Sequence, residues 1–479
     1  MNEKKISYLV LDQGTSGTKA FLFDENGKVL FSQKVKHSLQ KPAPHCIESD
    51  PLLILNACKS LIREMALYAK EKKYLIESAG LTAQRSTFMF WEKDSGKIRS
   101  QAISWQDSRS KKEADEKQEM AEFIWEKTGT PLSAHFGGPK YLHFTRKDAD
   151  LKSGTEKGNI LFGPISAYIA HQLTGNPYVD ESIACRSLFF DLEKSHWDDD
   201  LLDIFDMPKS GLPELRPTMS DYGNIEIDDQ SFPLKTVIGD QQAALIGQTG
   251  LNPGALAMNF GTSGSVQFNG GEKPGGTTGL ISSVLASDKN FRHFLFEGTI
   301  NACNSLFYHL EDILDIPHAE MKWDQRCENQ ETDGIYIPGF AGLASPYWVS
   351  GISDIMENIK EDSPNDLVRA GMESIGFLTA DIYDIISKKV KISPKRIPAS
   401  GGGARPVLLQ FLADLLQVPL GHTTMKDRTA YGVYKLLSGQ AFQEEIVECD
   451  QIFTPQMDES EKKSKLAQWT SALKKAEIL

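Results

Sequence analysis

The chain has 479 residues, of which 40% are hydrophobic and 24% are charged, and its formal net charge is −13. The length exceeds the roughly 250–300 residues at which a single hydrophobic core stops growing, so we expect two domains. The acidic balance excludes broad binding to nucleic acids or anionic membranes, which need a basic surface, but it leaves room for a local anion site.

The cysteines and the N-terminus indicate a cytoplasmic protein. Six cysteines are scattered without CxxC spacing, which is too sparse for a disulfide framework and predicts reduced thiols. The first apolar run ends at Asp12, so no signal peptide fits. No run of about 18 apolar residues occurs elsewhere, and we therefore expect no membrane span.

The first predicted elements are three strands joined by tight turns. Residues Tyr8–Gln33 contain a buried strand, a GTSG turn at Gly14–Gly17, a strand over Lys19–Asp24, a second turn and a third strand. Glycine lets backbone N–H groups approach a phosphate closely, and threonine and serine hydroxyls add further donors. The GTSG turn is therefore a candidate phosphate-binding loop.

Further along the chain, Asp240 lies at a predicted strand-to-helix junction. A β-rich run over Thr236–Ile238 is followed by Gly239, and an alanine- and leucine-rich stretch then predicts a helix. Aspartate is favoured as a helix N-cap, where it stabilises by about 1 kcal/mol, so a capping role is one interpretation. The other is a general base, because a carboxylate aimed at an acceptor hydroxyl can take its proton during phosphoryl transfer.

The strand–turn–strand pattern of the N-terminus recurs in the second half. Residues Ala255–Gly271 contain a hydrophobic strand, a second GTSG turn at Gly261–Gly264 and another strand. Two such turns could arise by chance in a chain with 38 glycines, but their shared context at the head of each half favours a repeat. One hairpin in each domain would enclose a polyphosphate from both sides of a cleft.

The last predicted elements are two helices, the first of which follows a glycine turn. Residues Ile397–Leu420 contain a GGGA turn that leads into an amphipathic helix. Because backbone N–H groups and the helix dipole favour anions there, the turn is a candidate nucleotide site. No P-loop motif or GxGxxG motif is present, which disfavours those folds. Leu466, Trp469 and Leu473 have helical spacing and predict a packed terminal helix.

These segments resemble, in order, the motifs of the FGGY family of carbohydrate kinases, and they are most similar to those of its glycerol kinase branch. The matching stretches are DQGTSGTK, GLTAQRSTFMFWEKDSGKIRSQAISWQDSR, ILFGPISAYIAHQLTG, GDQQAALIGQ, NFGTSGS, GFAGLASPYW, LVRAGMESIGF, SGGGA and TAYGVYKLL. The resemblance implies an α/β fold of two actin-like ATPase (ribonuclease H-like) domains around a central cleft. The acceptor-binding domain would cover residues 1–246 and the nucleotide-binding domain residues 247–479.

The resemblance also implies an activity and assigns roles by position. It implies ATP-dependent phosphorylation of a sugar or polyol hydroxyl, with ATP and Mg²⁺ as cofactors, and a homodimer is a further expectation from the family. Asp240 is the implied general base, and Asp12 and Asp240 would lie near magnesium, through water. The implied nucleotide-binding residues are Gly14, Thr15, Ser16, Lys19, Gly261, Thr262, Gly402, Gly403 and Ala404. The implied acceptor-binding residues are Gln84, Arg85, Trp105, His135, Asp240 and Gln241.

The acceptor site departs from the glycerol kinase pattern at three positions. Where the glycerol kinase pattern has a glutamate after the arginine, this chain has Ser86. The tyrosine of the pattern is replaced by His135, and a phenylalanine is replaced by Ser265. Because a site built for hydroxyls discriminates strongly when a buried partner is missing, we expect a larger polyol or ketose as acceptor, with glycerol weak or inactive. A lone histidine is more often structural, so a surface loop position for His135 stays an alternative.

Two other functions remain open from the sequence. One is a true glycerol kinase, and the other is an actin-like ATPase that works as a filament or chaperone module without kinase activity. Such an ATPase would share both phosphate hairpins, but a chaperone needs a peptide-binding domain, for which no residues remain. The acidic run Asp198–Asp200 fits a metal site or, more simply, the start of a helix.

Overall fold

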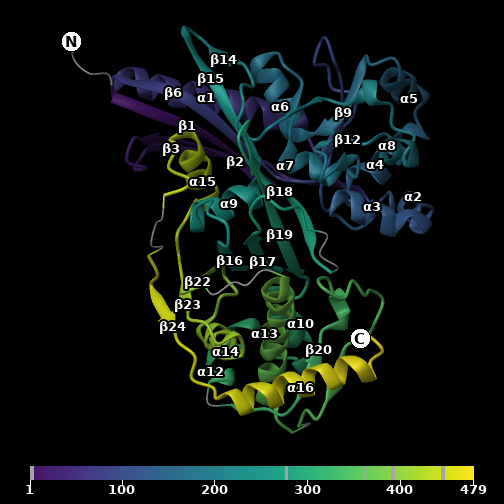
Figure 1. The fold of residues 1–479 in the computed structure, drawn as a ribbon, viewed down its shortest axis with the longest axis vertical. Coiled ribbons are helices and arrows are strands. Elements are labelled where there is room, and N and C mark those ends of the chain that lie inside the picture. Colours follow the sequence, from purple (N-terminus) through teal and green to yellow (C-terminus); the bar gives the residue numbers. More distant parts are fainter. Residues whose placement is uncertain (1–4, 276–278, 329, 361, 390–393, 444–447) are drawn as a thin grey trace.

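The structure is a computed structural model that describes residues 5–275, 279–328, 330–360, 362–389, 394–443 and 448–479. Two large sheets dominate it, the first built from the N-terminal half and the second from the C-terminal half (Figure 1). The first sheet has the order β14 (Asn224–Ile227), β15 (Gln230–Gly239), β6 (Tyr74–Ala83), β1 (Lys5–Gly14), β2 (Gly17–Asp24) and β3 (Val29–Lys36).

The second sheet repeats this arrangement. Its order is β18 (Ile281–Ser287), β19 (Arg292–Ile300), β17 (Gly264–Asn269), β16 (Leu256–Phe260), β22 (Ile397–Ser400), β23 (Leu420–His422) and β24 (Gln451–Phe453). In the first sheet β1 to β3 are antiparallel neighbours and β1, β6 and β15 run parallel. In the second sheet β16, β17 and β19 are antiparallel neighbours and β16, β22 and β23 run parallel. The predicted internal repeat and the predicted α/β fold are confirmed.

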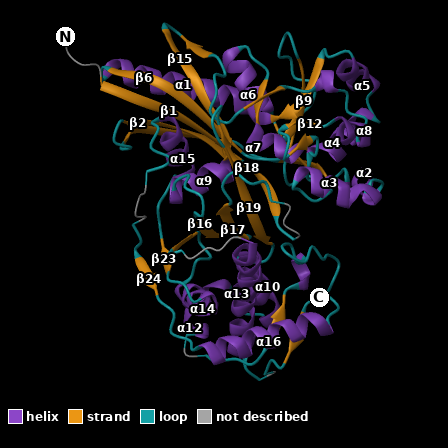
Figure 2. Ribbon diagram, in the orientation of Figure 1, coloured by secondary structure: helices purple, strands orange, loops and turns teal. Residues whose placement is uncertain are grey.

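A third sheet and four helices extend the N-terminal half on one side (Figure 2). The sheet has the order β4 (Gln40–Ala43), β5 (Cys46–Ser49), β8 (Ala102–Ile103), β7 (Phe88–Glu92) and β9 (Ile160–Pro164). The helices are α2 (Lys111–Asp115), α3 (Ala121–Thr128), α4 (Gly137–Thr145) and α5 (Ala149–Glu156). Short pairs complete the strands: β10 (Tyr178–Asp180) with β13 (Glu214–Arg216), β11 (Phe190–Asp191) with β12 (His196–Trp197), and β20 (Ile335–Ile337) with β21 (Ile355–Glu357).

Helices cover both halves and join them. The N-terminal half has α1 (Pro51–Glu71), α6 (Ile165–Thr174), α7 (Glu181–Ala184), α8 (Asp199–Ile204) and α9 (Asp240–Thr249). The C-terminal half has α10 (Asn304–Leu314), α11 (His318–Met321), α12 (Trp323–Cys327), α13 (Pro364–Lys389), α14 (Pro406–Leu416), α15 (Arg428–Leu437) and α16 (Glu459–Lys475). The predicted terminal helix is α16, in which Trp469 and Leu473 are buried. No described helix is long and apolar enough to cross a membrane, and none of the six cysteines, all of them described, forms a disulfide.

Helices α9 and α15 pack against each other between the two sheets. A Cβ on Gly247 would lie 1.9 Å from the carbonyl oxygen of Arg428, and one on Gly432 would lie 1.9 Å from that of Ala243, so only glycine permits this approach. Although α15 comes late in the chain, its Tyr434 is buried in a core shared with strands of the first sheet. The two helices therefore form a packed connection beside the strands that carry both GTSG turns.

Candidate active site

The two GTSG turns occupy equivalent places in the two sheets. The first joins β1 to β2 at Gly14–Gly17, and the second joins β16 to β17 at Gly261–Gly264. Ser16 and Thr262 are exposed at the tips of the turns. The side chain of Thr15 is already engaged, because its hydroxyl accepts from Trp105 Nε1 at 2.9 Å and donates to Gln84 Oε1 at 3.3 Å.

A cavity of about 680 Å³ lies between the first hairpin and the predicted glycine turn. Asp12 and Lys19 line it from the first sheet. The second half contributes Ser400, Gly401, Gly402, Ala404, Arg405, Pro406, His422, Thr423, Thr424, Met425, Asp427, Arg428 and Thr429. Gly401 has a φ of +101°, and a Cβ there would lie 2.3 Å from the Phe260 carbonyl oxygen. The Gly403 N–H donates to the same oxygen at 2.7 Å, so the glycine turn lies directly against the second phosphate hairpin.

Three cationic residues line this cavity, namely Lys19, Arg405 and Arg428. Lys19 Nζ lies 2.5 Å from Asp427 Oδ1, and both side chains keep about a third of their surface exposed (35% and 36%). Arg428 donates from Nη2 to Asn259 Oδ1 at 2.9 Å and from Nη1 to the Ser400 hydroxyl. Burial lowers the pKa of Arg428. Backbone N–H groups of a glycine turn next to cationic side chains can bind the phosphate groups of a nucleotide. Three of the predicted nucleotide-binding residues, Lys19, Gly402 and Ala404, line this one cavity.

Asp240 is the first residue of α9 and follows the last residue of β15. Gly239 occupies the N-cap position, so the capping interpretation of Asp240 is wrong. Its carboxylate accepts from the Gln241 N–H at 2.8 Å and lies 3.7 Å from Arg85 Nε. Burial raises the pKa of Asp240, although Arg85 opposes the increase. A carboxylate with a raised pKa is a stronger base, which suits a group that removes a proton near neutral pH.

Asp12 and Asp240 form an acidic pair near the first hairpin. Burial and the neighbouring charge of Asp240 raise the pKa of Asp12 to about 6, while Lys19 opposes the increase. The residues therefore fit a divalent cation, since hard cations prefer carboxylate oxygens and a cation would relieve the repulsion between the two groups.

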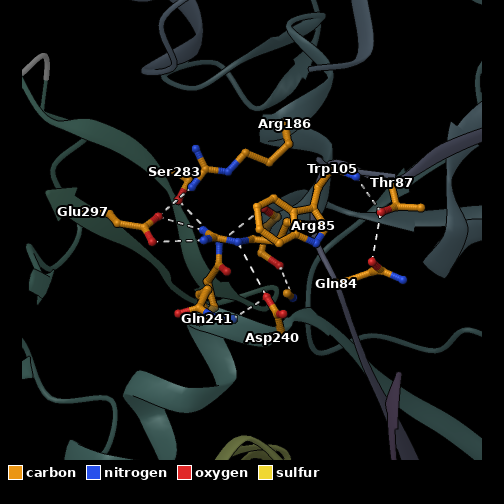
Figure 3. A network of polar contacts seen from close by, with 12 residues as sticks. Gln84, Arg85, Thr87, Trp105, Arg186, Asp240, Gln241, Ser283 and Glu297 are labelled. Atoms are coloured by element: carbon orange, nitrogen blue, oxygen red, sulfur yellow. Dashed lines mark hydrogen bonds and ion pairs between the residues drawn. The ribbon is translucent and has the colours of Figure 1, made fainter. Parts of the chain in front are cut away.

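A buried ion-pair network positions Arg85 (Figure 3). Its guanidinium donates to both oxygens of Glu297, on β19, at 2.8 and 3.0 Å. Arg186 donates to the same carboxylate at 2.7 Å. Burial would raise the pKa of Glu297, but the two guanidiniums outweigh it and lower the pKa to about 2. Arg85 is therefore fixed by a carboxylate of the other half of the molecule, beside Asp240.

Trp105 connects the acceptor residues to the first phosphate turn. Besides its indole bond to Thr15, its backbone N–H donates to the Thr87 hydroxyl at 3.2 Å, and Thr87 donates to Gln84 at 3.1 Å. The indole remains 43% exposed, so it is free to contact a ligand. His135 is an exposed loop residue, as the alternative predicted, but its Nδ1 also lies 3.0 Å from the Trp105 carbonyl oxygen.

Lys140 supports the acceptor residues from within the protein. It is fully buried, and its ammonium donates to the carbonyl oxygens of Ser86 at 2.8 Å and Ser104 at 2.7 Å. These residues are the direct neighbours of Arg85 and Trp105 in the sequence. Burial lowers the pKa of Lys140 to about 7, and Asp107 partly opposes this.

The structure thus brings together the predicted acceptor residues Gln84, Arg85, Trp105, Asp240 and Gln241. Sequence reasoning missed Glu297, Arg186 and Lys140, because nothing local distinguishes a charged residue that is buried with a distant partner. It also missed Asp427 and Arg428, although they stand directly before the recognised stretch TAYGVYKLL.

The acidic run near residue 198 has a structural explanation. Asp198 is the N-cap of α8, and its carboxylate accepts from Leu201 N–H. Asp191, His196 and Asp198 are close enough to share a cation, but Lys127 Nζ lies 2.8 Å from Asp198 and 3.4 Å from Asp191. The lysine therefore supplies the positive charge there, which supports the helix-start interpretation.

Comparisons with known proteins match this architecture. The model of the FGGY family of carbohydrate kinases, N-terminal domain, matches residues 7–247, and that of the C-terminal domain matches residues 256–438. The chain belongs to the FGGY family of carbohydrate kinases. The recognised resemblance is therefore confirmed, and the chain is a carbohydrate kinase by family.

The relatives of this kinase include glycerol kinases over nearly the whole length. The glycerol kinase of Thermococcus kodakarensis is 31% identical, with 98% of this chain and 96% of the relative covered. That of Leifsonia xyli subsp. xyli is 29% identical, with 98% and 97% covered. The solved structure of Plasmodium falciparum glycerol kinase with ADP has a TM-score of 0.89 at 27% identity, with 98% of each chain covered. A xylulose kinase structure from Lactobacillus acidophilus, at 20% identity and a TM-score of 0.84, shows the shared fold.

Proposed function

We propose that this kinase transfers the γ-phosphoryl group of ATP to a hydroxyl of a sugar or polyol larger than glycerol. One observation carries the proposal: Asp240 lies beside Arg85 in the acceptor network and close enough to Asp12 to raise its pKa. A base, an acceptor-binding cation and a phosphate-side carboxylate therefore meet at one point of the cleft.

The roles of the residues follow from this arrangement. Arg85 and Trp105 bind and orient the acceptor, so that one hydroxyl lies near the Asp240 carboxylate. Asp240 takes the hydroxyl proton as the oxygen forms its bond to the γ-phosphorus, and the bond from phosphorus to the β–γ bridging oxygen breaks to release ADP. Lys19, Arg428 and the glycine backbone would stabilise the phosphate charge.

Asp12 and Asp240 would hold Mg²⁺, through water, at the phosphate side of the cleft. A bound magnesium ion neutralises charge on the β- and γ-phosphates during the transfer. Because protonation of Asp12 removes the charge of one of the two carboxylates of this site, we expect magnesium binding to weaken as the pH falls.

The acceptor is either glycerol or a larger polyol or ketose. The three departures from the glycerol kinase pattern, at Ser86, His135 and Ser265, favour the larger acceptor. The relatives named glycerol kinase support the alternative of a true glycerol kinase. An actin-like ATPase without kinase activity is the third possibility. The buried network around Arg85 argues against it, because a nucleotide site alone has no use for a second set of preorganised polar groups.

An ADP-release assay with Mg-ATP tests the proposal. The acceptor panel is glycerol, erythritol, ribitol, xylitol, ribulose, xylulose, rhamnulose, fuculose and gluconate. Asp240→Asn should lower kcat by about 10²- to 10⁴-fold, the usual contribution of a general base. The matched control Asp150→Asn changes an exposed aspartate on α5 and should leave kcat unchanged.

The outcomes separate the three functions. Turnover of a larger polyol or ketose with weak glycerol activity supports the proposal. Turnover of glycerol at ordinary kinase rates, with the other acceptors inert, identifies a glycerol kinase. ATP hydrolysis that no acceptor stimulates, and that Asp240→Asn does not affect, identifies an ATPase.

A further inference from the structure

A second large cavity opens on the acceptor side of the cleft. Its volume is about 1170 Å³, compared with about 680 Å³ for the nucleotide cavity. Helices α2 and α3 and the loop that follows α3 form one wall, while the 341–350 segment of the other half forms the opposite wall. Ligand pockets for drug-sized molecules are typically about 300–1,000 Å³, so a three-carbon acceptor would leave most of this cavity empty.

The cavity borders the acceptor network. Thr299 lines the cavity and stands two residues after Glu297 on β19, so both side chains point to the same face of the sheet. Ile281 also lines the cavity and is the direct cross-strand neighbour of Glu297. On the other side, His135 connects the cavity to the acceptor residues, because it lines the cavity and contacts the Trp105 carbonyl oxygen. A ligand bound at Arg85 and Trp105 can therefore extend into the cavity.

Two indoles from opposite halves form the far end of this space. Trp125, on α3, and Trp348, on the 341–350 segment, meet edge to face with ring centroids 5.6 Å apart. Trp348 is fixed in place, because its Nε1 donates to the Gly279 carbonyl oxygen at 2.9 Å and its backbone N–H donates to that of Ala344 at 2.8 Å. Aromatic rings have a negative face that favours the weakly positive C–H groups of a sugar ring.

The charges along the cavity disfavour an anionic ligand end. Lys111 is paired with Asp115 at 2.8 Å, and the other ionic residues of that wall are Glu122 and Glu126. The wall therefore has an excess of carboxylates, which repel a carboxylate or phosphate and tolerate neutral hydroxyl groups. Ser133, His135 and Thr299 supply groups that can bond to such hydroxyls.

We propose that this cavity is a second acceptor subsite, which binds the neutral glycosyl ring of a glycosylated polyol against Trp125 and Trp348. The polyol end of the same molecule lies at Arg85, Trp105 and Asp240 and presents the hydroxyl that is phosphorylated. This inference rests on the proposed kinase function and names its acceptor class: a short neutral polyol that carries one neutral sugar.

Matched acceptor pairs test the subsite. The probes are glycerol, glucosylglycerol and glucuronosylglycerol, each measured for binding by calorimetry and for turnover by ADP release. Glucosylglycerol should bind at least about tenfold more tightly than glycerol, the range expected for one stacked, desolvated ring. Glucuronosylglycerol, with the same ring and one negative charge, should lose that gain.

Substitutions locate the effect in the cavity. Trp125→Ala should reduce the preference for glucosylglycerol over glycerol by about tenfold, whereas Trp125→Phe, which keeps an aromatic face, should retain most of it. Tyr308→Ala removes an exposed aromatic ring outside the cavity and should leave the preference unchanged. Thermal melting of each variant shows whether the fold is intact.

The possible results separate the subsite from the kinase function. Equal binding of glycerol and glucosylglycerol, or a preference that Trp125→Ala does not change, overturns the subsite even if polyols are phosphorylated. Preferential binding that depends on Trp125, without turnover of any acceptor, supports the subsite and contradicts the kinase function.

Discussion

The proposed acceptor side and the proposed nucleotide side of the cleft differ in the burial of their charged side chains. At the acceptor side, Arg85, Arg186 and Glu297 are connected by short ion pairs, with side-chain exposures of 14%, 3% and 4%. At the proposed nucleotide side, Lys19 and Asp427 stay about a third exposed, and the rest of the wall combines the glycine turn with hydroxyl-bearing residues and two arginines.

Under the proposed function, this difference predicts where selectivity for the acceptor lies. Charged side chains buried in fixed positions cannot adapt to a poorly matching ligand, so they discriminate between acceptors. Backbone N–H groups and partly exposed cations bind phosphate groups without regard to the rest of the ligand. Such binding is sufficient for a phosphate donor such as ATP, which the site does not have to distinguish from many similar molecules. Changes on the acceptor side should therefore affect stability and selectivity, whereas changes on the nucleotide side should mainly affect nucleotide binding.

The largest effect is expected from Glu297→Gln. It leaves Arg186 buried without a counter-charge and Arg85 with only the Asp240 carboxylate at 3.7 Å, which should lower the free energy of unfolding by about 3–5 kcal/mol. Chemical denaturation measures this change. The control Glu92→Gln weakens the partly exposed pair between Arg99 and Glu92 and should change the unfolding midpoint much less. Equal effects of both variants would show that the buried pairs of Glu297 contribute no more to stability than a more accessible ion pair does.

A smaller effect on stability with a clear sign is expected from Asp12→Asn. Because burial and Asp240 raise the pKa of Asp12 from 3.8 to about 6, its folded form binds a proton more tightly than its unfolded form. The native state therefore loses stability as pH rises from about 4 to about 6, by about 2 kcal/mol in total. At about pH 7.5 the variant should unfold at a higher denaturant concentration, while its KM for Mg-ATP rises. A lower midpoint would contradict this assignment.

Lys140→Met should separate acceptor binding from nucleotide binding. Without the ammonium, the carbonyl oxygens of Ser86 and Ser104 lose their donor, so the segments that carry Arg85 and Trp105 are free to shift. Loss of one such buried bond costs about 1–3 kcal/mol, and we expect the acceptor KM to rise about tenfold. The KM for ATP should not change, and the exposed Lys152→Met serves as control. A parallel rise in both KM values would indicate a purely structural role.

The smallest effect on stability is expected from Lys19→Met. The pair with Asp427 is partly exposed and screened by solvent, so the unfolding midpoint should stay within error. The KM for ATP should rise several-fold, because a cation next to the phosphates is lost. An unchanged KM for ATP would contradict the assignment of Lys19 to the nucleotide site.

The recurrent hairpins were predictable because their signals are local. Each GTSG turn lies between two hydrophobic strands, and the glycine turn directly precedes an amphipathic helix, so short-range chain geometry defines all three. The junction at Asp240 was also predictable, but its alternative as a helix cap was excluded only by the observed cap at Gly239.

The partners of the acceptor residues were not predictable. Arg85 and Glu297 are 212 positions apart, and Arg186 lies between them in the sequence. Glutamate in a strand and lysine in a helix usually indicate solvent exposure, and only packing shows that Glu297 and Lys140 are buried.

The sequence by itself determined the internal repeat, the two GTSG turns, the family and the position of Asp240 at a strand-to-helix junction, because these depend on residues close together in the chain. The tertiary structure decided which charges neutralise Arg85, what supports Trp105, and how large the space beside the acceptor residues is. Those properties depend on side chains that meet only after the two halves pack together, and burial then changes the pKa values and the ion-pair energies that no local pattern encodes.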